Sequence, residues 1–502
     1  MTISAEKIVA CLIAVSFATP VTPGAVLPDT SPRPRLIMLD DYGCEPDEEQ
    51  QVAHLLMYAN ELDIEGLLSV TSKHLKPPTQ PLRPDLAHRL IEGYAKVYPN
   101  LQLHATGWPT PTDLHSVVAT GQAFYGMADV RLGNSSPGSK LIVQALDKPD
   151  PRPIWIVVNA GSNTLAQALV DFCATHTPSQ TRAAIARLRV FDNGAQDDAG
   201  AWICHQFPLI HWLRSNVQTY AYGGPGPGDP AGFGPHYWHP YAYSAEGQRQ
   251  WMREHVQTNH GALGELIPDR CWPNGNSTIV AFMEGGGTIP FLGLVNKGLF
   301  DIDHPSWGGW GGRFTAEKVP DYWSRYDDIR VEERSVAPFF TYREASDVWT
   351  DPQDGTVYEG VCVPVWRWRA AMYADYICRM DWCVKPYAAA NHNPVAAFDG
   401  DTSRTVVRMR ALPGETLQFD ATASSDPDGD RLSFLWWIYE EAGTFSGRIV
   451  VYDANTPKPH LTVPAGAGGK QIHLILEVKD DGKPAPLTSY RRIVIDVDQT
   501  GP

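Results

Sequence analysis

The chain has 502 residues, of which 43% are hydrophobic and 20% charged, and this ordinary globular composition excludes a disordered polymer. The formal net charge of -16, without any basic stripe, argues against a nucleic-acid partner, because phosphates need clustered Lys and Arg. The 16 Trp and 20 Tyr make a high aromatic load, which serves either a large core or the stacking of sugar rings.

An export signal is predicted at residues 1–25. Lys7 precedes the apolar run IVACLIAVSFA, and small residues and prolines follow it. This run is too short to span a bilayer, and no later stretch is long enough, so no membrane partner is expected. N-glycosylation sequons at Asn134 and Asn276 agree with export. We therefore expect a secreted, extracellular glycoprotein.

The cysteines do not indicate a metal site. Of the 8 cysteines, Cys11 lies in the signal, and the odd remainder requires at least one free thiol or an intermolecular bridge. No cysteines and histidines have the spacing of a zinc site. For Cys378 and Cys383, which flank a helical stretch, a disulfide and buried thiols are both open.

From about residue 33 to 300, strand-like runs alternate with helical stretches. The predicted strands are RLIML, IEGLLSV, IWIVVNA, LRVFD and TIVAFM, and the predicted helices are QVAHLLMYANEL, DLAHRLIEGYAKVY, SKLIVQAL and TLAQALVDFCAT. This alternation predicts an α/β domain with a mainly parallel sheet and helices on both faces. Ligands of such sheets bind at the carboxyl ends of the strands. The Gly/Pro/aromatic loop at 223–243 is a candidate lid, and another helix is expected at 364–384.

From Asn391 the pattern changes to short, alternating, turn-separated segments, which predict a β-sandwich. Its stretch SSDPDGDRLSFLWW resembles PKD-like and cadherin-like modules, so an Ig-like sandwich is expected. Asp426, Asp428 and Asp430 either hold calcium or form a turn, for which DPDGD is a favourable sequence. The predicted domains therefore cover residues 33–390 and 391–502.

The stretch LDDYGCEPDEEQ, residues 39–50, crowds six carboxylates between a strand and a helix. The acids at 47–49 complement the positive end of the helix dipole. That explanation does not cover Asp41 and Glu45, which lie earlier in the turn. Crowded carboxylates repel one another unless a cation lies among them, and calcium takes six to eight oxygen ligands. We therefore favour a metal or catalytic site at this strand end, with helix capping alone as the alternative.

The same stretch resembles the Asp-rich motif of nucleoside hydrolases. More specifically, it is similar to a secreted nucleoside hydrolase-like family described as cellulose-binding proteins, whose members add a C-terminal β-sandwich. Further matching stretches are IEGLLSVTS, IWIVVNAGSNTLAQAL, FDNGAQDDAGAWICHQFP, FMEGGGTIPFLGLVNKGLFDIDHP and WGGWGGRF. The resemblance covers about residues 35–314 and implies a nucleoside hydrolase-like sheet and a carbohydrate or glycoside as the partner.

The resemblance also implies a calcium site. Asp41 matches the carboxylate that binds the metal and serves as general base. Glu45 and Asp47 match the next ligand region, although two extra residues leave the division of roles between them open. The backbone carbonyl of Ala160 matches another ligand. Glu48 stands where the family has a second Asp, and its extra methylene makes direct ligation doubtful.

Asp301 or Asp303, with His304, resembles the late Asp/His pair that completes the metal site and assists the leaving group. A turn cap beside Pro305 is the alternative role for His304. Glu284, beside three glycines, is a second candidate acid or a polar loop residue.

Polar and aromatic residues elsewhere are candidates for substrate binding. Trp307 and Trp310 either pack beneath the glycine-rich turn or form a sugar-stacking platform. Arg313 binds either a sugar hydroxyl or a structural carboxylate, and the structural role is favoured. The predicted substrate-binding residues are Asn163, Asn193, Asp198, Trp307, Trp310 and Arg313.

These residues together predict a metal-assisted hydrolase of an N- or O-glycosyl bond, with Asp41 as general base. The alternative is a non-catalytic binder of cellulose or another cell-wall glycan that retains the fold. A third and weaker interpretation is a scaffold whose acidic turn holds structural calcium.

Overall fold

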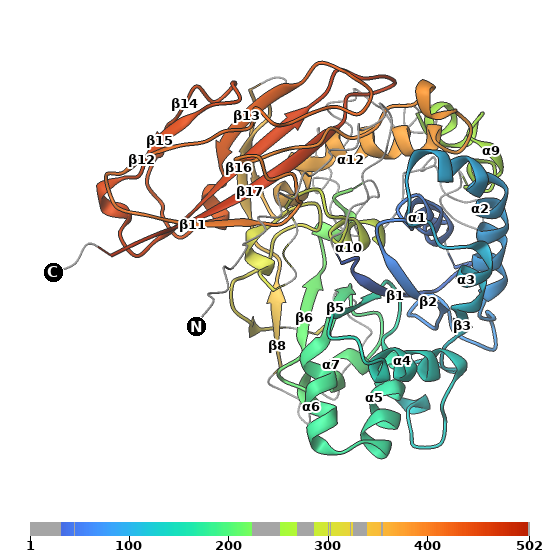
Figure 1. Cartoon of the computed structure of the whole chain (residues 1–502). Helices are drawn as coiled ribbons and strands as arrows, with labels where there is room; N and C mark the ends of the chain where they lie inside the picture. The colour runs from blue at the N-terminus through green and yellow to red at the C-terminus, as the bar shows by residue number, and fades with distance from the viewer. Residues whose placement is uncertain are drawn as a thin grey trace, which may run out of the picture.

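The computed structural model describes residues 32–44, 46–222, 251–268, 286–299, 301, 303–321, 323–324, 339–352 and 355–499 (Figure 1). Within these ranges no helix is both long enough and apolar enough to cross a bilayer. Several predictions fall outside them, namely the signal at 1–25, Glu45, the 223–243 loop, the TIVAFM strand and Glu284.

The first part of the chain is built on an eight-stranded sheet with the order β3-β2-β1-β4-β5-β6-β8-β7. All neighbouring strands are parallel except the edge pair β7–β8. The four predicted strands that lie in the described ranges are all present, so the mainly parallel α/β class is confirmed. The strands are β1 Arg35–Asp40, β2 Asp63–Ser69, β3 Val118–Thr120, β4 Ile154–Val158, β5 Leu188–Asn193, β6 His211–Ser215, β7 Val319–Pro320 and β8 Phe340–Arg343.

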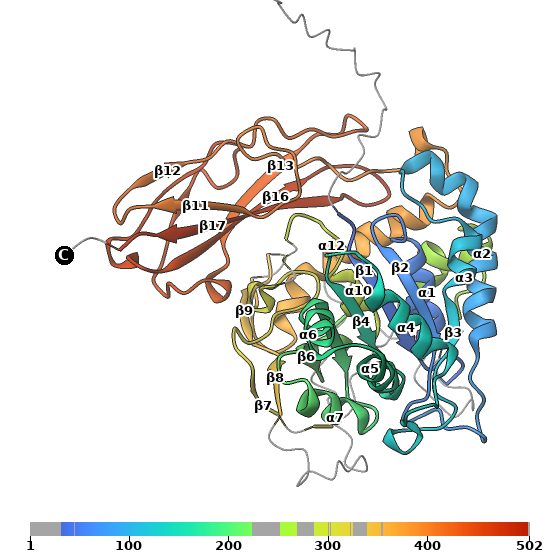
Figure 2. The ribbon, with the colours of Figure 1, turned by 60° about the horizontal axis from the view of Figure 1, so that its bottom comes forward.

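Helices cover both faces of this sheet (Figures 1 and 2). Successive residues of a strand point to opposite faces, so Leu36 and Met38 of β1 join one core while Ile37 and Leu39 join the other. The helices packed in the first core are α1 Asp47–Leu56, α2 Pro84–His104, α10 Thr288–Leu292 and α12 Val363–Asp381; those in the second are α4 Pro137–Asp147, α5 Asn163–Thr175, α6 Pro178–Arg187 and α7 Ala199–Gln206. Smaller elements are α3 Pro111–Ser116, α9 Gly261–Gly264 and the hairpin β9 Asp347–Thr350 and β10 Val357–Gly360.

The C-terminal part is a β-sandwich, as predicted, with its own apolar core between two sheets. Its strand pairs are antiparallel except β11–β17, which is parallel. The Ig-like relationship itself stays a prediction. The first sheet contains β11 Val407–Ala411, β13 Ser433–Ile438, β16 Gln471–Lys479 and β17 Thr488–Val497, and the second contains β12 Thr416–Gln418, β14 Val451–Tyr452 and β15 His460–Thr462.

The two parts share one apolar core. Trp368 of α12 packs against Tyr439 and Tyr490 of the sandwich, with ring centroids 6.1 and 5.4 Å away. The backbone N–H of Tyr490 donates to the carbonyl of Lys297 at 2.9 Å, which extends the edge of β17 into the first domain. Figure 1 shows α12 lying between the two parts. The sandwich is therefore docked through packing and backbone hydrogen bonds.

The cysteine question is settled for the six described cysteines, which are all free. Cys378 and Cys383 are buried thiols. Burial raises the pKa of both well above the usual value for a thiol.

A histidine pair links the two parts at the boundary. His104 Nδ1 lies 3.0 Å from His392 Nε2, and His104 Nε2 lies 2.8 Å from the Lys385 carbonyl. His392 Nδ1 in turn lies 2.9 Å from the carboxylate of Asp428 in the sandwich. Because the carbonyl requires a proton on Nε2 of His104, the neutral His104 accepts a bond from His392 through Nδ1.

Acidification from pH 6.5 to 4 is expected to destabilise this boundary. Burial, followed by the charge of His392, lowers the pKa of His104 from 6.5 to about 4. Between these values the unfolded chain binds a proton that the folded chain does not, so stability falls as the pH falls. Melting temperatures measured across this range should therefore decline less in His104→Gln than in the natural chain. Replacement of the exposed His205 by Gln is the control, and an identical pH slope in all three proteins would contradict the prediction.

Candidate active site

Asp40, the last residue of β1, lies at the carboxyl edge of the sheet and is fully buried. Its Oδ1 accepts hydrogen bonds from Gln51 Nε2 at 3.0 Å and Asn159 Nδ2 at 2.8 Å. Burial raises the pKa of Asp40 to about 7, the Asn159 bond opposes this rise, and the charge of Asp41 adds to it. Asp40 is therefore a carboxyl group that exchanges its proton near neutral pH.

Asp41 follows immediately and is also buried. Its Oδ2 accepts a short hydrogen bond from Ser72 Oγ. Burial raises the pKa of Asp41 to about 6, against the opposing effect of its bonds with Ser72 and Glu48. Two adjacent carboxyls that titrate near neutrality are suited to moving protons at physiological pH.

Amide side chains surround this pair. Four buried amide oxygens have no hydrogen-bond partner among the described residues: Gln51 Oε1, Asn159 Oδ1, Asn193 Oδ1 and Gln196 Oε1. Buried polar atoms are normally satisfied, so these acceptors are suited to a bound molecule with donors or to a cation. Because all four atoms are hydrogen-bond acceptors, they suit a ligand rich in hydroxyl groups, which donate hydrogen bonds.

Gly286 and Gly287 close this edge of the site. A Cβ on Gly287 would overlap Gln51 and Asn159, and a Cβ on Gly286 would overlap Asn193. A side chain at either position would displace these amides from the site.

The next acidic pair serves the structure of the surrounding loops. Asp197 accepts bonds from Ser162 Oγ and from the backbone N–H of Asn163, both at 2.9 Å, and burial raises its pKa to about 6. Asp198 accepts a bond from the Met127 N–H at 2.8 Å. Asn163 donates to the Phe124 carbonyl at 2.8 Å. Of the predicted binding residues, Asn163 and Asp198 thus hold the loop at 124–127, whereas Asn193 lies beside Gly286.

The predicted calcium ligands Asp41, Asp47 and Ala160 all lie at this carboxyl edge and are buried. In the described part of the chain, however, the turn does not bring three carboxylates within 4.8 Å of one another. The acids face different neighbours, since Asp40 faces the amides and Asp41 faces Ser72. The potential metal ligands at this edge are nevertheless oxygen atoms of carboxylates, amides and carbonyls, which are the ligands that calcium prefers.

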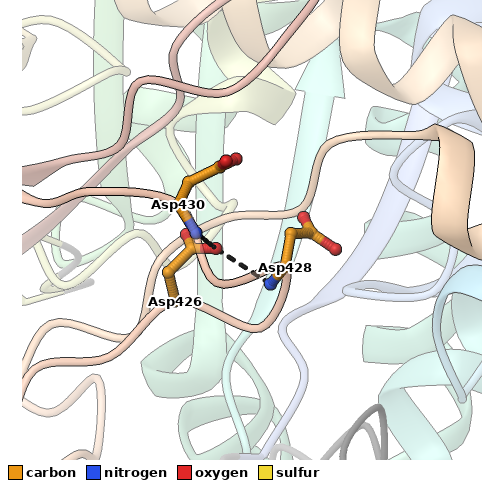
Figure 3. Close-up of side chains that lie close together, drawn as sticks. All are labelled: Asp426, Asp428 and Asp430. Atoms are coloured by element: carbon orange, nitrogen blue, oxygen red, sulfur yellow. Dashed lines mark hydrogen bonds between the residues drawn. The ribbon is translucent and has the colours of Figure 1, made fainter.

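Among the described residues, the three acids that approach one another within 4.8 Å are Asp426, Asp428 and Asp430 in the sandwich. Asp426 Oδ1 accepts the backbone N–H of Asp428 at 2.8 Å and of Asp430 at 3.1 Å, as Figure 3 shows. The carboxylate of Asp428 is bonded to His392. These bonds define a turn, in agreement with the turn interpretation of DPDGD.

Asp301 and His304 lie at the opposite, amino edge of the sheet, which corrects their predicted role. Asp303 pairs at 2.6 Å with Arg189, the second residue of β5. Asn193, the last residue of β5, lies about 13 Å from Arg189 along the strand, at about 3.3 Å per residue. His304 Nδ1 bonds Asp301 at 2.8 Å. Both line a cavity of about 70 Å³ with Trp155 and His211, near the starts of β4 and β6. They therefore do not complete a site around Asp41.

The aromatic platform is also corrected. Trp307 and Trp310 are only 4% and 3% exposed. Trp307 stacks on His304, with centroids 3.9 Å apart, and packs edge-on against His473 of β16 at 4.9 Å. Arg313 bonds Asp347 at 2.6 Å, so its structural role holds. The glycine-rich loop therefore packs against the sandwich and presents no open ring to a sugar.

Asp40, Gln51 and Ser72 are site residues that the sequence did not single out. A usable signal existed for Asp40, because a carboxylate that ends a fully buried strand has no structural reason to be there. Gln51 and Ser72 carry no such signal, since amides and hydroxyls are common on helices and in turns.

The parallel sheet with carboxylates and amides at its carboxyl edge defines a nucleoside hydrolase-like protein. The family model of the nucleoside hydrolase-like domain of cellulose-binding Sde182 matches residues 35–314, and that of the C-terminal domain of cellulose-binding protein Sde0182 matches residues 416–497. The chain belongs to this family, and the resemblance inferred from its motifs is confirmed.

A solved structure agrees with this assignment. A nucleoside hydrolase-related hypothetical protein from Saccharophagus degradans, described as associated with carbohydrate metabolism, is 34% identical, with 93% of this chain and 100% of that chain covered and a TM-score of 0.77. The effector protein XOO4466 is 13% identical, with 72% and 95% of the two chains covered and a TM-score of 0.34, so it adds no argument. No curated protein matches the chain.

Proposed function

We propose that this chain is a secreted carbohydrate-active protein that hydrolyses a glycosyl bond at the carboxyl edge of its sheet. The observation that carries the proposal is the pair Asp40 and Asp41, with pKa values raised to about 7 and 6, beside four amide oxygens without described partners. The cellulose-binding description of the family and the carbohydrate association of the Saccharophagus degradans protein support a sugar as the substrate.

In the proposed mechanism Asp41, when ionised, takes a proton from the attacking water, and Ser72 fixes its orientation. The amide oxygens of Asn159 and Asn193 accept bonds from sugar hydroxyls, and the glycines at 286–287 allow the ring to approach the backbone. A calcium ion held by Asp41, Asp47 and the Ala160 carbonyl would supply positive charge that acidifies the water and binds hydroxyl groups. Glu284 is the proposed acid for the leaving group.

A non-catalytic glycan-binding protein is the second candidate. The specific observation in its favour is the position of Asp301 and His304 at the far edge of the sheet. Without this pair, the histidine that the sequence assigned to protonate the leaving group does not lie beside Asp41. In this case the amides would bind a sugar that is not cleaved.

Asp41→Asn is expected to lower turnover at least about 100-fold, because it removes the general base while keeping the shape of the side chain. The assay uses ribosides and neutral cell-wall oligosaccharides, each with added calcium and with a chelator, and the chelator should also lower both turnover and the melting temperature.

Asp303→Asn, at the amino edge, is the matched control and should keep full activity. Undiminished hydrolysis in Asp41→Asn would overturn the proposed base. Sugar binding by the natural chain without turnover of any substrate would favour the second candidate.

A further inference from the structure

A second concave surface lies far from the carboxylates, where α12 and the β9–β10 hairpin meet strands β16 and β17 of the sandwich. This groove encloses about 420 Å³, within the usual size range of small-molecule sites. Its lining includes Trp349 of β9, Trp366 of α12, and Glu477 and Lys479 of β16. None of the residues around Asp40 and Asp41 belongs to it.

Partly exposed aromatic rings line the groove. Trp349 and Trp366 are half-buried, in contrast to the fully buried Trp307 and Trp310. Their rings flank Tyr358, with centroids 6.1 and 6.2 Å from its ring. A tryptophan ring offers a flat apolar face, and the C–H face of a pyranose is its natural complement because contact removes both apolar surfaces from water.

The sequence of α12 explains why this side of the groove is hollowed. Trp366, Ala370, Ala374 and Ile377 recur at spacings of three and four residues, so they share one helix face. The alanines leave space between the larger side chains at either end. A flat molecule can therefore lie along this face of the helix.

The charges around the groove are nearly balanced. Arg367, Arg369 and Lys479 are accompanied by Asp351 and Glu477. Arg367 is compensated by Asp347 at 3.1 Å. A polyanion needs uncompensated cations, whereas a neutral polyhydroxylated molecule uses both donors and acceptors. The charge pattern therefore fits a neutral glycan.

We propose that this groove is a binding site for a neutral oligosaccharide, separate from the hydrolytic site and assembled only when the sandwich is docked. Trp349 and Trp366 supply the stacking surfaces, while Glu477 and the exposed Lys479 line the sandwich wall, where they reach ring hydroxyls. The sandwich contributes one wall of the groove, from β16 and β17. The site goes beyond the proposed hydrolysis and does not depend on it.

Titration calorimetry of the full chain with neutral β-linked hexasaccharides of glucose, xylose and mannose tests the site. Trp349→Ala and Trp366→Ala are each expected to weaken binding about tenfold, since truncating an aromatic anchor removes most of its contact area. Ala374→Leu should weaken binding similarly by filling the groove, and it should leave folding intact because leucine is a good helix former. Melting temperatures identify any variant that misfolds.

The controls separate this site from the carboxylate site. Trp202→Ala removes a half-buried tryptophan of α7 outside the groove and should leave the affinity unchanged. In an Asp41→Asn background, which prevents hydrolysis during the titration, the Trp349 and Trp366 substitutions should weaken binding by the same factor. Unaltered binding in the Trp349, Trp366 and Ala374 variants would overturn the proposal, as would preference for an oligogalacturonate or failure of the natural chain to bind any neutral hexasaccharide.

Discussion

Ending the chain at Tyr387 is expected to give an aggregated product, although this truncation retains the entire parallel sheet. The truncation uncovers Trp368, which packs against Trp437, Tyr439 and Tyr490 of the sandwich. The truncated chain therefore exposes the large apolar face of Trp368 on α12, and exposed apolar patches promote association.

Size-exclusion chromatography and thermal unfolding of the truncated and full chains provide the measurement. The sandwich alone, residues 391–502, is the companion fragment, and it should be more soluble because it has its own core. A monomeric 33–387 fragment with cooperative unfolding would show that the first domain is independent. The predicted boundary between residues 390 and 391 would then separate two independently folding units.

Replacing Asp375 with Ala is expected to destabilise the protein by about 3–5 kcal/mol, because it leaves the buried ammonium of Lys297 without its carboxylate partner. Asp375 accepts bonds from Lys297 Nζ at 2.7 Å and Arg379 Nε at 3.1 Å, and all three side chains are buried. Burial alone would raise the pKa of Asp375, but the charges of Lys297 and Arg379 hold it well below its usual value. Removing the carboxylate takes away the attraction that offsets the cost of burying the Lys297 ammonium.

Urea unfolding of Asp375→Ala measures the loss. Asp496→Ala is the surface control, since its partner Arg408 is half-exposed and such pairs contribute about 0–1 kcal/mol. Adding Lys297→Met to Asp375→Ala should recover part of the loss, because it removes the unpaired buried ammonium, whereas Arg379 keeps its ion pair with Glu61. Equal stability of Asp375→Ala and Asp496→Ala would show that the buried pair contributes little.

The strands that the sequence predicted are those with continuous apolar runs, such as IWIVV in β4. Strand β6, HWLRS, was not predicted because Arg214 interrupts its pattern. The guanidinium of Arg214 is buried and donates to the carbonyl of Trp323 at 2.8 and 3.0 Å. That acceptor lies more than a hundred residues away in the chain, so no local pattern reveals that an arginine there is satisfied inside the fold.

The same limit explains the predicted site. Asp41 and Asn193 directly follow or end buried strands, and the topology rule for parallel sheets correctly places such residues at the carboxyl edge. Asp301 follows a longer path. Gly287 lies at the carboxyl edge against Gln51, and the chain then passes through α10 to Leu299, which lines the amino-edge cavity. The rule applies only to the first residues after a strand. It does not reveal that the chain later crosses from the carboxyl edge to the amino edge, because that path depends on tertiary packing.

Two glycines of the first domain, Gly308 of the WGGWGGRF loop and Gly298 before it, are explained by contacts with the sandwich. Gly308, at φ +73°, lies against the Tyr439 ring, and Gly298, at φ +93°, lies against the Tyr490 carbonyl. Both positions combine a left-handed backbone with a neighbour from the sandwich, so a side chain at either one would push the domains apart. During evolution these glycines should therefore vary with the sandwich rather than with the chemistry. A related protein that has lost activity but keeps the sandwich should retain both glycines. A relative without the C-terminal domain should not need them.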